Sequence, residues 1–440
     1  MKRQAVLALL AAMVCQNTLQ AQTWSLTQCI DHALAHSITV KQSDNSLKKQ
    51  SVQLSTARNQ RLPDLSASAS ENVSFGRGLT SDNTYSRRNT ATTSFSLNTS
   101  VPIFTGFRIP NNVRINRLNL LAAVADLEKA KNDIRVQVAQ AYVQILYDME
   151  ISDVAHRQVS IDSVQVARLQ ALLDVGKASQ VQLSQQKATL AKSQLTATQA
   201  DNKRHLSLLA LTQLLELPSP EGFSIVRPEV QDSVADESAL TPDMIYYEAA
   251  SFRPEIEAQN LRLNAANRNI AVAKAPLYPQ LSFSAGLGSS YYDTSGKPDD
   301  DFGMQLRHNF SQHVGLSLTY SIFNRFQTRN AIRSARIDYQ NQMLALEKTK
   351  KTLYKEIQQA YYNMVAAQQK LHSSSQARHS AADAFQLMSA KYELGNATIT
   401  EFNESKNTYL KAESDLTQAR YEYLFQHALI LFYRGKELKF

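Results

Sequence analysis

A long internal duplication constrains the fold of this 440-residue chain more than any other feature of its sequence. One offset of 219 residues aligns Ile103 with Ile322 and Gly176 with Gly395, and no gap is needed between these positions. Solenoid repeats are only about 20–50 residues long. The duplicated segment is therefore half of a protein present twice, and the halves are expected to fold alike.

Long helices are expected because the residues that interrupt helices are scarce, with 12 glycines and 11 prolines in the whole chain. At 1.5 Å per residue the longer ones extend about 100 Å, a length suited to crossing a periplasm. Each copy contains two long helices in succession with a glycine between them, so each such pair of helices is predicted to be an antiparallel hairpin. The predicted helices cover 106–173 and 179–217 in the first copy, and 325–393 and 397–434 in the second.

Four shorter segments alternate apolar and polar residues with the period of a β-strand. In the first of them Leu65, Ala67 and Ala69 share one face, and serines occupy the other. Strands that span a membrane have about 9–11 residues and alternate in this way. A soluble β-sandwich shows the same alternation, but the duplication and the export signal described below favour membrane strands. The predicted strands cover 65–76, 91–101, 281–291 and 313–322.

The N-terminus has the pattern of a secretory signal peptide over residues 1–21. Lys2 and Arg3 precede an apolar run, and cleavage is expected after the small residue Ala21. The processed chain then keeps one cysteine, Cys29, so no intramolecular disulfide is expected. No later stretch has 18 consecutive apolar residues, so no transmembrane helix is expected either.

Two structural repeats are predicted, over 22–217 and 242–440, joined by a proline-rich, acidic linker over 218–241. Helices are expected before the strands of each copy, over 25–60 and 242–275. The fold class is thus α with transmembrane β, in two tandem helix–strand–strand–helix repeats. Four strands cannot close a barrel, and open sheet edges are not tolerated in lipid. Two, three or four chains would share a barrel of 8, 12 or 16 strands.

This order of elements resembles the TolC family of outer-membrane efflux proteins. The strand-to-helix turns VPIFTGFR and YSIFNRFQ and the helix tips VGKAS and LGNAT carry the resemblance. It implies a homotrimer in the outer membrane, with a 12-stranded β-barrel above an α-helical tunnel in the periplasm. It also implies a periplasmic adaptor and an inner-membrane pump of the RND or ABC class as partners, with no cofactor.

The resemblance also implies functional residues. Two acidic residues after the second tip glycine, Glu401 and Glu404, match the acidic ring that the family has at the periplasmic entrance. In such a ring, repulsion between the carboxylates would raise their pKa values, and their negative charge would attract cations. The matching first-copy residue, Gln182, has no charge. Tip residues expected to dock the adaptor are Val175, Gly176, Leu394 and Gly395, and the strand-to-helix turns contain Pro102, Phe104, Gly106 and Phe323.

Other functions find less support in the sequence. His32 and His36 have the i, i+4 spacing of zinc ligands, but no third ligand is evident. Nothing resembles a catalytic motif, so no enzyme is predicted, and an exported chain with mixed charges is not expected to bind nucleic acid. The remaining alternative is an exported coiled-coil scaffold, which has no use for lipid-facing strands. The cargo, whether drug, metal ion or protein, is left open.

Overall fold

The computed structural model describes residues 22–79, 83–87, 89–228, 241–294 and 301–439. The predicted signal peptide and residues 229–240 of the predicted linker lie outside the described residues. The chain divides into two compact units. The helical unit comprises Met1–Asn45, Ala125–Ile256 and Lys348–Phe440, and the sheet unit comprises Ser46–Val124 and Glu257–Glu347.

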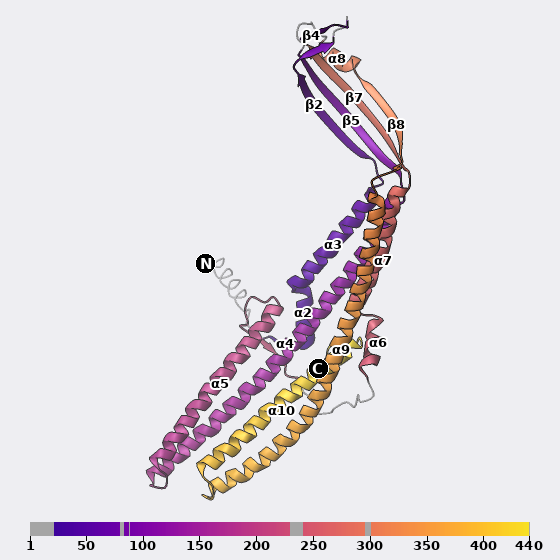
Figure 1. Ribbon diagram of the computed structural model, residues 1–440. Coiled ribbons are helices and arrows are strands. Elements are labelled where there is room, and N and C mark those ends of the chain that lie inside the picture. The colour runs from indigo at the N-terminus through magenta and orange to yellow at the C-terminus, as the bar shows by residue number, and fades with distance from the viewer. Residues whose placement is uncertain (1–21, 80–82, 88, 229–240, 295–300, 440) are drawn as a thin grey trace, which may run out of the picture. The chain divides into compact units, whose positions relative to one another are not determined.

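The sheet unit contains a four-stranded antiparallel sheet with the order β2-β5-β7-β8 (Figure 1). Its strands are β2 (Asp64–Ser74), β5 (Thr90–Thr105), β7 (Gln280–Thr294) and β8 (Ser311–Thr319). The central pair, β5 and β7, joins the two copies of the duplication. In the first copy a short hairpin, β3 (Arg77–Leu79) with β4 (Tyr85–Arg87), lies between β2 and β5. In the second copy helix α8 (Phe302–His308) lies between β7 and β8.

The two faces of this sheet differ in polarity, because the strand register brings like residues together. On one face Leu97 lies opposite Leu287, and Phe283 lies opposite Leu316. Large side chains on this face are exposed, among them Leu316 at 68%. The other face is rich in serine and glycine, and the hydroxyls of Ser68 and Ser96 lie 2.7 Å apart. They are the side chains of directly paired residues on β2 and β5.

Strand β5 continues past Pro102, which the sequence analysis took as its end; that prediction is wrong. The strand reaches Thr105, and its register against β7 shifts between Pro102 and Phe104. Proline has no backbone N–H to donate to a ladder, and a bulge accommodates it without ending the strand. At the other edge, β8 ends at Thr319, three residues before the predicted end.

The helical unit contains most of two long helical hairpins (Figure 1). The first hairpin is α4 (Arg108–Asp174) with α5 (Gln180–Leu214), and the second is α9 (Gln327–Glu393) with α10 (Ile399–Tyr433). Both α4 and α9 have 67 residues, and both α5 and α10 have 35. The bounds lie within three residues of those predicted from the sequence, because capping residues and glycines mark the helix ends.

Shorter elements lie before and between the hairpins. They are α2 (Leu26–His36), α3 (Ile38–Asn59), α6 (Pro242–Ala250), α7 (Pro254–Lys274) and the 3₁₀ turn η1 (Ala275–Leu277). A two-stranded parallel sheet of β1 (Gln22–Trp24) and β6 (Phe223–Ile225) was not predicted. It ties the segment after the first repeat to the start of the described chain, and the Tyr142 hydroxyl donates to the Val226 carbonyl beside it (2.6 Å).

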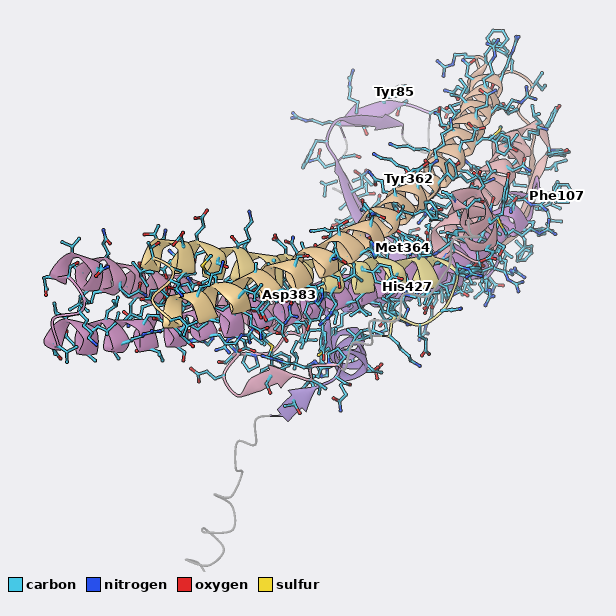
Figure 2. The ribbon with its side chains drawn as sticks, turned by 90° about the horizontal axis from the view of Figure 1, so that it is seen from below. Tyr85, Phe107, Tyr362, Met364, Asp383 and His427 are labelled. Carbon is cyan, nitrogen blue, oxygen red and sulfur yellow. The ribbon has the colours of Figure 1, made fainter. Side chains whose placement is uncertain are left out.

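The core of the helical unit is a thin seam between helices. Its main cluster joins α2, α4, α5 and α10, with Val138, Ile145 and Leu211 all at 0% exposure. Figure 2 labels two neighbouring residues of α9, of which Met364 is 6% exposed and Tyr362 is 62% exposed. Among the described residues, no helix combines the length and the apolarity that a membrane span requires.

Candidate functional site: the hairpin tips and the adjoining helices

Each hairpin turns at a glycine with a left-handed backbone. Gly176 has φ +73° and Gly395 has φ +77°, a conformation that favours glycine. In both tips the glycine N–H donates to the carbonyl three residues back, and the next N–H donates five residues back. This pair of bonds satisfies carbonyls at the end of the helix, so both glycines act as helix caps. Docking of a partner at these glycines is left as a prediction.

Apolar side chains project from both tips at equivalent positions of the duplication. Val175 is 66% exposed and Leu394 is 78% exposed, each directly before the tip glycine. An apolar side chain exposed to this extent at a turn contributes little to the core of its own hairpin. Both residues are therefore available for contact with another protein.

Residues Glu401 and Glu404, predicted to form an acidic ring, lie on the first turns of α10, and both are exposed. The carboxylate of Glu401 accepts hydrogen bonds from the Thr398 N–H (2.7 Å) and the Thr398 hydroxyl (2.8 Å). The Glu401 N–H in turn donates to the Thr398 hydroxyl (3.3 Å), and this bond together with that from the Thr398 N–H forms a capping box, which satisfies N–H groups at the helix start. Ser179 and Gln182 form the same box at the start of α5.

The capping bonds change the expectation for Glu401. The hydrogen bond from the Thr398 backbone N–H, followed by that from its side chain, lowers the pKa of Glu401 below its ordinary value. Repulsion within an acidic ring of several chains would act in the opposite direction. In a single chain Glu401 is therefore a carboxylate at neutral pH, held at the helix N-terminus where negative charge is favoured.

The sequence analysis missed a buried ion pair close to these glutamates. Lys406 on α10 and Asp162 on α4 form a salt bridge in which both side chains are 0% exposed. The Asp162 carboxylate also accepts hydrogen bonds from the Ser193 hydroxyl (2.5 Å) and the Gln186 amide (3.2 Å), both on α5. Lys406 therefore points into the helical unit and pairs there. The signal available in the sequence was a difference between the two copies. Asp162 aligns with Ala381, so the aspartate is present in the first copy but not in the second.

The predicted strand-to-helix turns share one backbone conformation. Gly106 and Phe107 have φ +61° and +65°, and Arg325 and Phe326 at the same places in the second copy have φ +53° and +61°. A Cβ on Gly106 would lie 2.2 Å from the Ala275 carbonyl oxygen, so only glycine fits there.

Aromatic contacts reinforce both of these turns. The rings of Phe104 and Phe107 meet edge to face at 5.2 Å, and those of Phe323 and Phe326 at 5.5 Å. Such pairs fix the direction in which the chain leaves the strand. Pro102, the remaining predicted turn residue, lies in the bulge of β5 instead. These turn residues shape the fold.

The two histidines with zinc-ligand spacing are stacked on each other. The rings of His32 and His36 lie 4.0 Å apart with an interplanar angle of 15°. Burial, followed by repulsion from His36, lowers the pKa of His32. No group of three or more metal-ligating side chains occurs in the described part of the chain.

A second group of charges is partly buried where α4, α9 and the end of α10 meet. Arg253 is 5% exposed, and its guanidinium lies over the rings of Phe432 (4.8 Å) and Tyr433 (4.7 Å). Partial desolvation, followed by repulsion from Glu255, raises the pKa of Glu356, an exposed residue that lines a cavity together with Arg253. The ionised form of Glu356 is therefore disfavoured by the folded state.

Comparison with known proteins identifies relatives along most of the chain. The sequence profile of the family described as "Outer membrane efflux protein" matches residues 29–216 and 245–430. Outer membrane efflux protein BepC of Brucella suis is 21% identical over 405 residues, covering 90% of this chain and 82% of that protein. Pyoverdine export outer membrane protein OpmQ of Pseudomonas aeruginosa is 26% identical over 286 residues, covering 64% of this chain and 57% of OpmQ.

Solved structures show the same fold at low sequence identity. The outer membrane protein VceC of Vibrio cholerae superimposes with a TM-score of 0.76 at 20% identity, covering 94% of this chain and 97% of VceC. The CmeC outer membrane channel of Campylobacter jejuni gives 0.79 at 17% identity, covering 94% and 86%. A further relative by sequence is fusaric acid resistance protein FusA of Burkholderia cepacia, which is 31% identical over 174 residues. That match covers 38% of this chain and 31% of FusA.

Proposed function

Because this chain belongs to the outer membrane efflux protein family, we propose that it is the exit duct of a tripartite efflux system. The family and the fold are those of outer-membrane channel proteins. In the proposed role the chain carries no catalysis and holds no cofactor. It provides a passive path across the periplasm and the outer membrane, while an inner-membrane pump of the RND or ABC class supplies the energy.

The four-stranded sheet is the observation that carries this proposal. Within the described part of the chain, its outer strands, β2 and β8, each pair on one side only. One face is apolar and exposed, and the other is serine-rich. An open sheet edge is not tolerated in lipid, so the edges must pair with other copies. Three chains would make a closed barrel of 12 strands, with the apolar face toward lipid and the serines toward the lumen.

The hairpins support the second half of the proposal. Helices α4 and α9 have 67 residues each, and both return at tips that carry exposed apolar side chains. In a trimer, the six hairpins would surround a tunnel in the periplasm. The periplasmic adaptor would then contact Val175, Gly176, Leu394 and Gly395, where apolar surface is available for burial.

Glu401 and Glu404 are proposed to line the entrance of this tunnel. At i and i+3 they share one face of α10. Three copies would place six carboxylates close together, and such rings favour cations and bind multivalent ones. The capping bond to Thr398 holds the Glu401 carboxylate in place before any ligand arrives.

Single-channel recording in planar bilayers tests the proposal. The Glu401→Gln, Glu404→Gln variant should conduct with weaker cation selectivity and weaker block by cobalt hexammine, a trivalent cation. The change is well matched, because Gln182 already forms the same capping box in the first copy. Absence of any conductance from the wild-type protein would refute the duct. Unchanged selectivity and block would refute the acidic entrance alone.

A further inference from the structure

One histidine projects from the serine-rich face of the four-stranded sheet. The strand register places Ser66, Asn98, Gly286 and His313 in one row across β2, β5, β7 and β8. Directly paired residues have their side chains on the same face of a sheet, so His313 shares the face of the serine hydroxyls. His313 is exposed, and its imidazole is therefore open to whatever fills the space beside this face.

The histidine ring has a defined position on the sheet. A Cβ on Gly286 would overlap the His313 ring and the Asn98 amide oxygen, so both side chains occupy the space above this glycine. Asn98 Nδ2 donates to Ser96 Oγ (3.1 Å), and the Ser96 hydroxyl lies 2.7 Å from that of Ser68. A row of polar groups therefore leads across the sheet from β2 to the imidazole.

Ionisable side chains are rare on this face of the four strands. Besides His313 they are Asp64 on β2 and Tyr292 on β7, while β7 presents only serine and glycine beside His313, and β5 presents Asn98. The Asp64 carboxylate lies three strands away and accepts a hydrogen bond from the Ser100 N–H (2.6 Å). Histidine is the side chain that ordinarily changes charge between about pH 5 and pH 8. Protonation of His313 would therefore change the net charge of a surface with few other charges.

We propose that His313 sets the charge of the barrel near its outer end, so that the ion selectivity of the barrel depends on the pH of the medium. The inference rests on the proposed function, in which the serine-rich face lines the lumen. In the sheet unit α8 lies at one end of the sheet and α9 begins at the other (Figure 1). His313 lies about 20 Å along β8 from Thr319, the end nearer α9, and thus near the end that faces the medium.

The direction of the effect follows from the charges on the barrel wall. In a closed barrel β8 would pair with β2 of the neighbouring copy, so each His313 would have an Asp64 carboxylate on the adjacent strand. A neutral imidazole leaves Asp64 as the charged group of the wall, which favours cations. Three protonated imidazoles offset these carboxylates and favour anions, because rings of charged side chains select ions by their charge.

Reversal potentials in planar bilayers test this proposal, in a shallow KCl gradient near about 0.1 M, where the Debye length is about 10 Å. All proteins carry Glu401→Gln and Glu404→Gln, so that the entrance carboxylates do not titrate. Acidifying the outer side from about pH 7.5 to about pH 5.5 should raise the chloride-to-potassium permeability ratio about two- to threefold. His313→Gln should remove most of this rise, and about 1 M KCl should suppress it by screening.

Moving the histidine along β8 supplies a matched control. Ser311→His in the His313→Gln protein should restore the rise, because alternate residues share a face and Ser311 lies opposite Gly288, where a ring has room. Gln312→His places the imidazole on the apolar face and should not restore it. An equal rise with and without His313, or restoration by Gln312→His, would overturn the proposal.

Charged thiol reagents test the same position without titration. His313→Cys should react with a cationic methanethiosulfonate and shift selectivity toward anions, whereas an anionic methanethiosulfonate should shift it toward cations. Val314→Cys, on the apolar face where the valine is 74% exposed, should not respond. Cys29 is buried, and burial raises the pKa of its thiol to about 12, so the reagents leave it unmodified. No response at position 313 would overturn the proposal, whereas a protein that never conducts would refute the proposed duct.

Discussion

Replacing Lys406 with methionine should loosen the contact between the two hairpins far more than any surface substitution. Methionine keeps most of the apolar stem but removes the ammonium, so the Asp162 carboxylate remains at 0% exposure without a cation. Breaking a buried pair by removing one partner costs about 3–5 kcal/mol. The Ser193 and Gln186 donors remain and offset only part of this cost.

Amide hydrogen exchange measured by mass spectrometry reports this loss locally. Peptides that cover residues 403–410 of α10 should exchange faster, because local opening becomes easier. Since about 1.4 kcal/mol corresponds to a tenfold change, the expected acceleration is roughly two to three orders of magnitude. Peptides from the four-stranded sheet, which belongs to the other unit, should keep their wild-type rates.

Two matched variants complete the test. Lys187→Met removes an exposed lysine at the equivalent position, and its effect should be within about 0.5 kcal/mol. Asp162→Asn together with Lys406→Met leaves no unpaired charge and should recover most of the lost protection. Wild-type exchange rates in Lys406→Met would refute the reasoning. So would a double variant as unprotected as the single one.

Other substitutions test separate parts of the account. Glu356→Gln should raise the unfolding temperature at pH 7 but not at pH 4. The raised pKa of Glu356 means that its contribution to stability is complete below the ordinary pKa of 4.5 and is lost as the pH rises through the pKa of the folded state. The uncharged glutamine does not suffer this loss. In thermal unfolding, Gly106→Ala should destabilise the protein clearly more than Gly176→Ala. Both have positive φ, but only Gly106 would place its new Cβ against a neighbouring backbone. Val175→Asp with Leu394→Asp should abolish co-purification of the adaptor while trimer and membrane insertion persist, and retained adaptor binding would place the docking surface elsewhere.

Much of the fold could be predicted because its signals are local and occur twice. At each hairpin tip the first helix ends at a glycine, Gly176 or Gly395, and the second begins at a capping residue, Ser179 or Thr398, so these bounds are readable from the sequence. The strands alternate because one face is apolar along its whole length. Family membership follows from the same order of elements, and the profile match confirms it.

The remaining features depend on contacts between residues far apart in the chain. Nothing near Lys406 indicates that it is buried, since its partner Asp162 lies 244 positions away. The pairing of β1 with β6 also joins residues far apart in the sequence, such as Gln22 and Phe223. Pro102 illustrates another limit, because a bulge can carry a strand past a proline that local rules treat as its end. The capping role of Glu401 was readable from Thr398 three residues before it, but the acidic-ring interpretation obscured it.

The number of chains in the assembled protein tests the central claim most directly. The protein is extracted with detergent from the outer-membrane fraction, and its native mass is measured by mass spectrometry. Our account predicts three copies of the processed chain, because β2 and β8 must each find a partner strand on another chain and the resemblance to the TolC family implies a trimer. A stable monomer, or a protein recovered from the soluble periplasmic fraction, would contradict it.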